Sequence, residues 1–157
     1  MGGRYPLPVQ EDLRDLLTEL LGREVNVGRI DQLAPQGAVA DYVTDEGAVA
    51  AVVVCDLAFA CRAGAAITLI PSPAAEESIA EGALTPALTE NLREILNVTA
   101  RLLNSAQTPH VRLRALHGPG IQPPAEVGRL VAQPADRRSF EVEIQGYGSG
   151  RLTFAIA

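Results

Sequence analysis

Two amphipathic helical segments, each followed by strand-like segments, constrain the fold of this chain more than any other feature. The first helix is predicted over Val9 to Gly22 and the second over Pro86 to Ser105. In both, leucines recur at spacings of three and four residues and therefore share one face. Gly22 is a typical helix stop, and Thr85 followed by Pro86 is a typical helix start. The sequence thus predicts a helix-then-strands unit that occurs twice.

The remaining segments are short and bounded by turn residues. Ala48 to Cys55 is apolar throughout, which predicts a central strand buried on both faces. Leu57 to Ile70 is predicted to form a short helix, and Pro71 to Gly82 a polar connector. The predicted strands are Glu24 to Leu33, Val39 to Thr44, Gly47 to Asp56, Val111 to Leu116, Glu126 to Gln133, and a hairpin from Phe140 to Ile156 that turns at Gly146 to Gly150.

The two helices can be aligned with each other. Glu11 to Thr18 lies over Glu90 to Asn97 at an offset of 79 residues. Amphipathic helices also resemble one another by chance, so both a duplication and a coincidence remain open. A duplication predicts halves of about residues 8–70 and 85–157, paired across a pseudo-twofold axis. We expect one α/β (α+β) domain over residues 1–157, with two long helices packed on a largely antiparallel sheet.

Composition excludes several kinds of partner. The net charge is -6, and all 13 basic residues are arginine. Nucleic acid and anionic membranes both reward basic patches, so we expect neither as a partner. The longest apolar run is too short to cross a bilayer, and the N-terminus lacks the pattern of a signal peptide. We therefore expect a cytoplasmic protein.

The cysteines and histidines do not predict a metal site. Cys55 and Cys61 have neither metal-site spacing nor a CxxC arrangement and are expected to be buried thiols. His110 and His117 flank a predicted strand. A zinc site or a catalytic triad would need further partners that the sequence does not place, which favours ordinary histidines at the ends of loops.

The second helix carries an ordered polar row. At about 100° per residue, Glu90, Glu94, Asn97 and Arg101 share a narrow sector opposite the apolar side. A solvated helix face is one explanation of this row. A second is a functional surface, because a carboxylate and a carboxamide one turn apart on a rigid helix can reach together into another molecule.

The residue types in this row and in the rest of the sequence limit the reactions that the protein can catalyse. The sequence contains no nucleophile elbow, no lysine, no Walker loop and no GxGxxG motif. Glu90 and Glu94 on an exposed helix do not favour a glycosidase or a metal site. Asn97 exchanges no proton near pH 7, so its chemical use is to orient a water molecule. Hydrolysis of an acyl phosphate needs such a water, and Glu94 could pair with a cation on the partner.

The arrangement Glu90-x3-Glu94-x2-Asn97, followed after 21 residues by Pro119, resembles the signature of the CheC/CheX-type chemotaxis phosphatases. These are pseudo-twofold α/β proteins that dephosphorylate the receiver domain of the response regulator CheY. The resemblance implies that Asn97 positions the hydrolytic water and that Glu94 pairs with the regulator's lysine. It also implies Mg²⁺ supplied by the regulator rather than bound by this chain. We expect Glu90, Arg101 and Pro119 to be partner-binding residues; Arg101 stands where members of the family commonly have small residues, so it could help or hinder docking.

Only the second half carries the complete motif, since the first has Asp15 and Thr18 at the positions of Glu94 and Asn97. The chain is therefore more similar to the one-site CheX type. Proteins of that type dimerise through a sheet edge, so the resemblance implies a homodimer for this chain as well. Members of this fold also include flagellar-switch adaptors that bind regulators without hydrolysing anything. A phosphatase of phosphorylated CheY-like receivers and a non-catalytic adaptor are thus the two functions to be distinguished.

Overall fold

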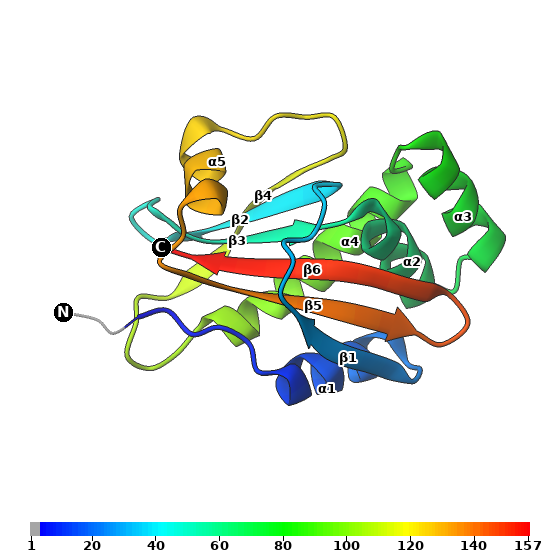
Figure 1. Cartoon of the computed structure of the whole chain (residues 1–157), viewed down its shortest axis with the longest axis horizontal. Helices are drawn as coiled ribbons and strands as arrows, with labels where there is room; N and C mark the ends of the chain where they lie inside the picture. Colours follow the sequence, from blue (N-terminus) through cyan, green and yellow to red (C-terminus); the bar gives the residue numbers. More distant parts are fainter. Residues whose placement is uncertain (1–3) are drawn as a thin grey trace.

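The computed structural model describes residues 4–157 and has a sheet of six strands with helices on both faces (Figure 1). The strands are β1 (Val25–Ile30), β2 (Ala38–Thr44), β3 (Val49–Cys55), β4 (Val111–His117), β5 (Asp136–Ile144) and β6 (Gly148–Ile156). The helices are α1 (Gln10–Leu21), α2 (Leu57–Ile67), α3 (Ser72–Glu81), α4 (Pro86–Thr99), the 3-10 helix η1 (Ala100–Leu103) and α5 (Ala125–Ala132).

The strand order shows how the two halves of the chain combine. The order is β1-β5-β6-β3-β2-β4, and all neighbours are antiparallel. Each side of the sheet holds a hairpin from one half and an edge strand from the other. The halves meet at the centre, where β3 pairs with β6 from Ala51 opposite Ile156 to Cys55 opposite Leu152. This confirms the prediction that the halves merge into one sheet with a pseudo-twofold arrangement.

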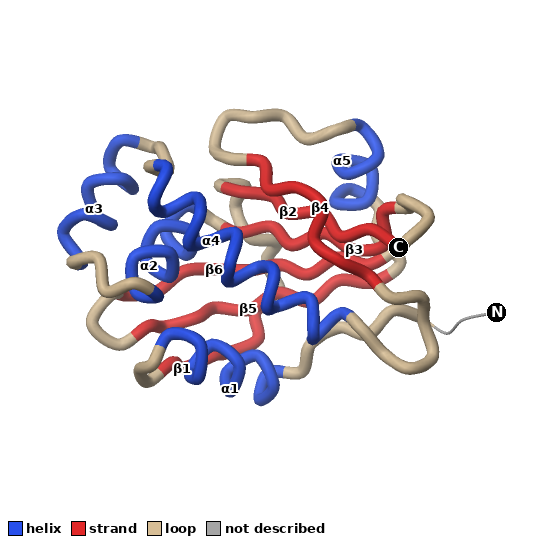
Figure 2. Tube along the Cα trace, turned by 180° about the vertical axis from the view of Figure 1, so that it is seen from behind, coloured by secondary structure: helices blue, strands red, loops and turns tan. Residues whose placement is uncertain are grey.

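Helices cover the sheet unequally. Helices α1, α2 and α4 lie on one face, as Figure 2 shows, and the main hydrophobic core lies beneath them. Helix α5 packs on the opposite face through Val127 and Leu130, against Val52 and Val54 of β3. Because β3 has helices on both sides, residues 50–55 are buried, which confirms the predicted central strand. Ala48, which the prediction included, is exposed and lies before the strand. No helix of the described chain is long and apolar enough to span a membrane.

Local capping signals explain where the helices begin and end. Helix α1 ends at Gly22, which has a φ of 66° that favours glycine. The Thr85 hydroxyl accepts a hydrogen bond from the Leu88 amide at 3.2 Å and caps α4. The Asp56 carboxylate accepts one from the Phe59 amide at 2.7 Å and caps α2, so the predicted helix after β3 is confirmed.

Two predicted segments were wrong. Pro71 to Gly82 is not a connector, because Ser72–Glu81 forms helix α3, whose buried residues Ala75 and Ser78 are too small to give a strong apolar signal. Glu126 to Gln133 is not a strand, because Ala125–Ala132 forms helix α5. Its apolar residues Val127, Leu130 and Val131 have helical spacing, although the β-branched Val127 and Val131 favour a strand by local propensity.

The boundaries of the second half also differ from the prediction. The last hairpin begins at Asp136, earlier than Phe140, and Gly148 and Gly150 belong to β6 rather than to the turn. A Cβ at Gly150 would lie 2.4 Å from the Phe59 Cα, so glycine there permits the close approach of α2 to β6. The helix predicted to reach Ser105 is α-helical only to Thr99 and continues as η1.

Both thiols are buried, as predicted, and we expect them to be unreactive in the folded protein. Burial raises the pKa of Cys61 to about 11 and raises that of Cys55 further. At pH 8 only about one Cys61 in a thousand would be a thiolate, the reactive form. Labelling with Ellman's reagent should detect no fast thiol in buffer and two in denaturant. A fast-reacting thiol in buffer would contradict the burial of these residues.

Candidate functional site

Helix α4 has one buried and one exposed side. Its exposed side carries Glu90, Glu94 and Asn97, which confirms the helical phase predicted from the sequence. The buried side consists of Leu88, Leu92, Ile95, Leu96 and Thr99. Leu92, Ile95 and Leu96 lie in the main core, whereas Leu88 packs in a smaller cluster with α2 and α3. Because the buried side fixes the rotation of the helix, the polar row is held facing outwards on a rigid support.

Glu90, Glu94 and Asn97 of the polar row lie along a groove between α4 and the edge strand β4. The volume of this groove is about 300 Å³. On the α4 side, Arg93 lies 3.6 Å from Glu90 as an exposed ion pair. The structure therefore brings Glu90, Glu94 and Asn97 together in one groove, whose complete lining is Glu90, Arg93, Glu94, Asn97, Leu113 and Arg114.

Tyr42 supports α4 from below and was not predicted as part of the site. The side chain is fully buried, and its hydroxyl donates to the Leu96 carbonyl at 2.7 Å. The Ala100 amide donates to the carbonyls of Asn97 and Val98, because the helix tightens into η1 at this point. Tyr42 thus holds the backbone of α4 immediately before Asn97. The sequence shows only a strand tyrosine and gives no sign of the element above it.

We expect Tyr42→Phe to destabilise the protein by about 1–2 kcal/mol, because it leaves the buried Leu96 carbonyl without its partner. Tyr147→Phe is the matched control, since the half-buried Tyr147 also donates its hydroxyl to a carbonyl at 2.7 Å, that of Ile70, which is not part of the 96–100 segment. Urea denaturation of both variants gives the loss of stability. Only Tyr42→Phe should increase hydrogen exchange around residues 96–100, and equal exchange in both variants would contradict its support of α4.

Two residues predicted to bind the partner lie outside this groove. Arg101 is exposed on η1 and lines a different groove, next to α1. Pro119 is half-buried in the turn after β4 and is not among the residues that line the groove of the polar row. On α1, Asp15 and Thr18 are exposed, as their counterparts on α4 are. Partner binding by Arg101 and Pro119 remains a prediction.

A buried polar cluster joins β2, β4 and α5. The Asp41 carboxylate is fully buried and accepts hydrogen bonds from Arg114 Nε at 2.6 Å and His117 Nε2 at 2.8 Å. Arg114 Nη1 also contacts Glu126 Oε1 of α5 at 3.3 Å. The hydrogen bond to Asp41 is the main reason that the pKa of Arg114 is raised. His117 is therefore a structural partner of a buried carboxylate rather than a simple loop-end histidine.

Asp41 was missed in the sequence although a signal existed, namely a single carboxylate within an otherwise apolar strand. Such a residue is buried only with a partner, but the sequence does not show that Arg114 and His117 are that partner. His110 is exposed and lies before β4. Within residues 4–157, no group of three or more His, Cys, Asp or Glu side chains could hold a metal ion.

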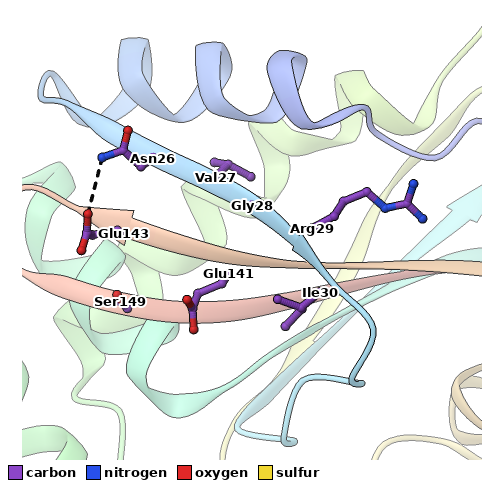
Figure 3. A pocket seen from close by; sticks show the side chains of 8 residues that line it. All are labelled: Asn26, Val27, Gly28, Arg29, Ile30, Glu141, Glu143 and Ser149. Carbon is purple, nitrogen blue, oxygen red and sulfur yellow. Dashed lines mark hydrogen bonds between the residues drawn. The ribbon is translucent and has the colours of Figure 1, made fainter.

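The outer face of β1, β5 and β6 carries another hollow, shown in Figure 3, that offers no comparable chemistry. Asn26 and Glu143 point toward each other there and form a hydrogen bond of 3.4 Å. Glu141 lies 3.7 Å from Arg151 in an exposed ion pair. These polar groups satisfy one another, so the groove along α4 is the stronger candidate site.

Comparison with known proteins gives structural matches without sequence matches. No protein-family model matches the chain, and no similar sequence is found among curated proteins. The FliM middle domain of H. pylori superposes with a TM-score of 0.64 at 11% identity, over 94% of this chain and 84% of that one. The CheX of Borrelia burgdorferi, crystallised with CheY, BeF3 and Mg²⁺, gives 0.50 at 12% identity, over 90% of each chain.

FliY of Thermotoga maritima is also similar, with a TM-score of 0.50 at 14% identity over 92% of this chain and 82% of that one. At these identities the likeness establishes the fold. The chain has the fold that CheX, FliY and the FliM middle domain share, which confirms the resemblance found in the sequence at the level of structure. This fold includes both a CheY-binding protein and flagellar proteins, so the choice between phosphatase and adaptor depends on the site.

Proposed function

We propose that this protein binds a phosphorylated CheY-like receiver domain through the exposed side of α4 and accelerates hydrolysis of its aspartyl phosphate. The observation that carries the proposal is the exposure of Glu94 and Asn97 in one groove, one turn apart on a helix whose other side is buried. A site without a nucleophile or a metal cluster of its own suits a reaction whose phosphoryl group, metal and lysine belong to the partner. The proposed partner implies a cytoplasmic location.

Asn97 is the proposed catalytic residue. Its carboxamide oxygen accepts a hydrogen bond from a water molecule and directs that water at the phosphorus atom, in line with the aspartyl oxygen. The new bond joins the water oxygen to phosphorus, and the bond between phosphorus and the aspartyl oxygen breaks. Inorganic phosphate leaves, the water's proton passes to the products, and the aspartate carboxylate is regenerated. Mg²⁺ held by the receiver neutralises charge, so this chain needs no cofactor of its own.

Glu94 is the proposed docking residue. An exposed carboxylate one turn before Asn97 can pair with the receiver's lysine and fix the register of the two proteins. Glu90 and Arg101, one turn beyond either end of this pair, extend the contact along α4 and η1. Pro119 contributes through the turn that follows β4. The roles of Glu90, Glu94, Asn97 and Pro119 carry over from the motif residue by residue, whereas that of Arg101 is proposed from its place one turn after Asn97.

A non-catalytic adaptor is the second candidate, and one observation favours it. The FliM middle domain, with a TM-score of 0.64, is more similar in structure than CheX, with 0.50. In solved complexes FliM of H. pylori binds FliG and SpeE. On this alternative the α4 groove recognises a receiver or flagellar partner, and Asn97 contributes only binding.

The two candidates differ in one measurement. A receiver domain from the same genome is phosphorylated with acetyl phosphate, and its loss of phosphate is followed with and without this protein. A phosphatase accelerates the loss at substoichiometric concentration, so one molecule acts repeatedly. Binding with an unchanged rate of loss would favour the adaptor. A receiver that lacks the phosphorylated aspartate serves as the control for association that does not depend on phosphate.

A further inference from the structure

A second groove lies between α1 and the C-terminal end of α4 with η1. Figure 2 shows these elements next to each other on the helical face of the sheet. The volume of the groove is about 450 Å³. Its apolar lining consists of half-buried side chains from both walls: Leu16, Leu20, Val98 and Leu102. Neither Glu94 nor Asn97 lines it, and of the residues proposed to contact the receiver only Arg101 does.

The two walls of this groove carry opposite charge. The α1 wall presents the exposed carboxylates of Asp12, Asp15 and Glu19, whereas the η1 wall presents the exposed guanidinium of Arg101. The nearby Arg14 lies 3.1 Å from Asp15 and 3.9 Å from Glu11, so Asp12 and Glu19 carry most of the negative charge that this rim offers to a partner. The groove is therefore an apolar strip between an acidic rim and a basic rim.

The dimensions of the groove fit a helix. Asp12 and Leu20 are eight residues apart on α1, which corresponds to a length of about 12 Å. That length accommodates about two turns of a partner helix, whose apolar residues at positions i, i+3, i+4 and i+7 form one stripe. A helix satisfies its own backbone hydrogen bonds and needs only side-chain contacts from the two walls.

We propose that this groove binds an amphipathic helix of a partner protein, with its apolar stripe on Leu16, Leu20, Val98 and Leu102. Arginine or lysine on one flank of that helix pairs with the acidic rim, and a carboxylate on the other flank pairs with Arg101. The two rims thus fix the direction of the helix as well as its affinity. A second copy of this chain suits the acidic rim poorly, because each copy carries a net charge of -6.

The test uses two stapled 15-residue helical peptides of identical composition. Both carry leucines in the apolar stripe. The first has arginines on one flank and glutamates on the other, as proposed, whereas the second has both residue types mixed equally on both flanks and so matches the two rims in neither direction. Fluorescence anisotropy with the full chain should give at least tenfold tighter binding of the first peptide. Equal binding of the two peptides, or binding of neither, would overturn the proposal.

Variants of the protein localise the binding. Glu19→Arg should weaken the first peptide at least tenfold, whereas Glu77→Arg, the same change on an exposed position of α3, should not. NMR shifts on adding the peptide should concentrate in residues 12–20 and 98–102. Shifts elsewhere, or an equal effect of both variants, would show non-specific attraction to an acidic protein and overturn the proposal. Loss of dimers in Glu19→Arg by sedimentation would instead assign the groove to a second copy.

Discussion

Asn97→Ala is expected to reduce the acceleration of aspartyl-phosphate hydrolysis by about 100-fold or more, because the attacking water loses the group that orients it. Asn97 is exposed and its removal opens no cavity in the core, so the folded structure should be unchanged. Binding of the receiver should change little. The measurement is the rate of phosphate loss from a phosphorylated receiver at saturating concentration, together with the dissociation constant of the complex.

The first half of the chain supplies a matched control. Thr18 occupies the position on α1 that aligns with Asn97 and is also exposed, so Thr18→Ala should leave the rate unchanged. Glu94→Gln should act differently from Asn97→Ala by weakening binding more than the maximal rate, and its effect should shrink as salt screens the ion pair. Full activity of Asn97→Ala would remove the basis for the phosphatase, whereas wild type that binds without accelerating hydrolysis would indicate the adaptor.

Arg114→Ala is expected to produce the largest loss of stability among polar substitutions, about 3 kcal/mol. The change removes the guanidinium from a fully buried carboxylate, Asp41, and leaves only His117 as its partner. An uncompensated buried charge costs about 3–5 kcal/mol, and the remaining bond to His117 places this case at the lower end. The loss should appear in urea denaturation monitored by circular dichroism.

Glu126→Gln is the control for the exposed part of the same cluster. It removes only the negative charge that lies 3.3 Å from Arg114, on a half-exposed Glu126 side chain, and should cost less than about 1 kcal/mol. A variant that replaces Asp41 and Arg114 together by apolar residues should recover much of the stability lost in Arg114→Ala, because no charge is then left unpaired. Equal losses in Arg114→Ala and Glu126→Gln would show that burial of Asp41 is not what makes Arg114 important.

Short-range signals allowed most elements to be predicted. Gly22, Thr85 and Pro86 mark helix ends through backbone geometry that depends on neighbouring residues alone, and the apolar run from Ala48 to Cys55 allows only a buried strand. The prediction failed for α3 and α5, where the local pattern was ambiguous. In α5 the residues Val127, Leu130 and Val131 are compatible with either element, and the apolar face of β2 and β3 decides for a helix.

In the candidate site, too, some features could be predicted from the sequence and others could not. The exposure of Glu90, Glu94 and Asn97 follows from helical phase, since seven residues make about two turns and the leucines opposite must be buried. The sequence does not predict the hydrogen bond that holds the backbone just before Asn97. Tyr42 is 54 residues away along the chain from the Leu96 carbonyl that it contacts. Asp41 and Arg114, 73 residues apart, meet only because β2 and β4 pair.

The sequence by itself determined the two amphipathic helices, the buried central strand and the polar row on α4, because each depends on periodicity within one segment. Only the tertiary structure decided the exchange of edge strands between the halves, the partner of the buried Asp41 and the groove between α1 and α4. These features depend on which distant segments lie side by side, and that choice minimises the exposed apolar surface of the whole chain rather than of any one segment.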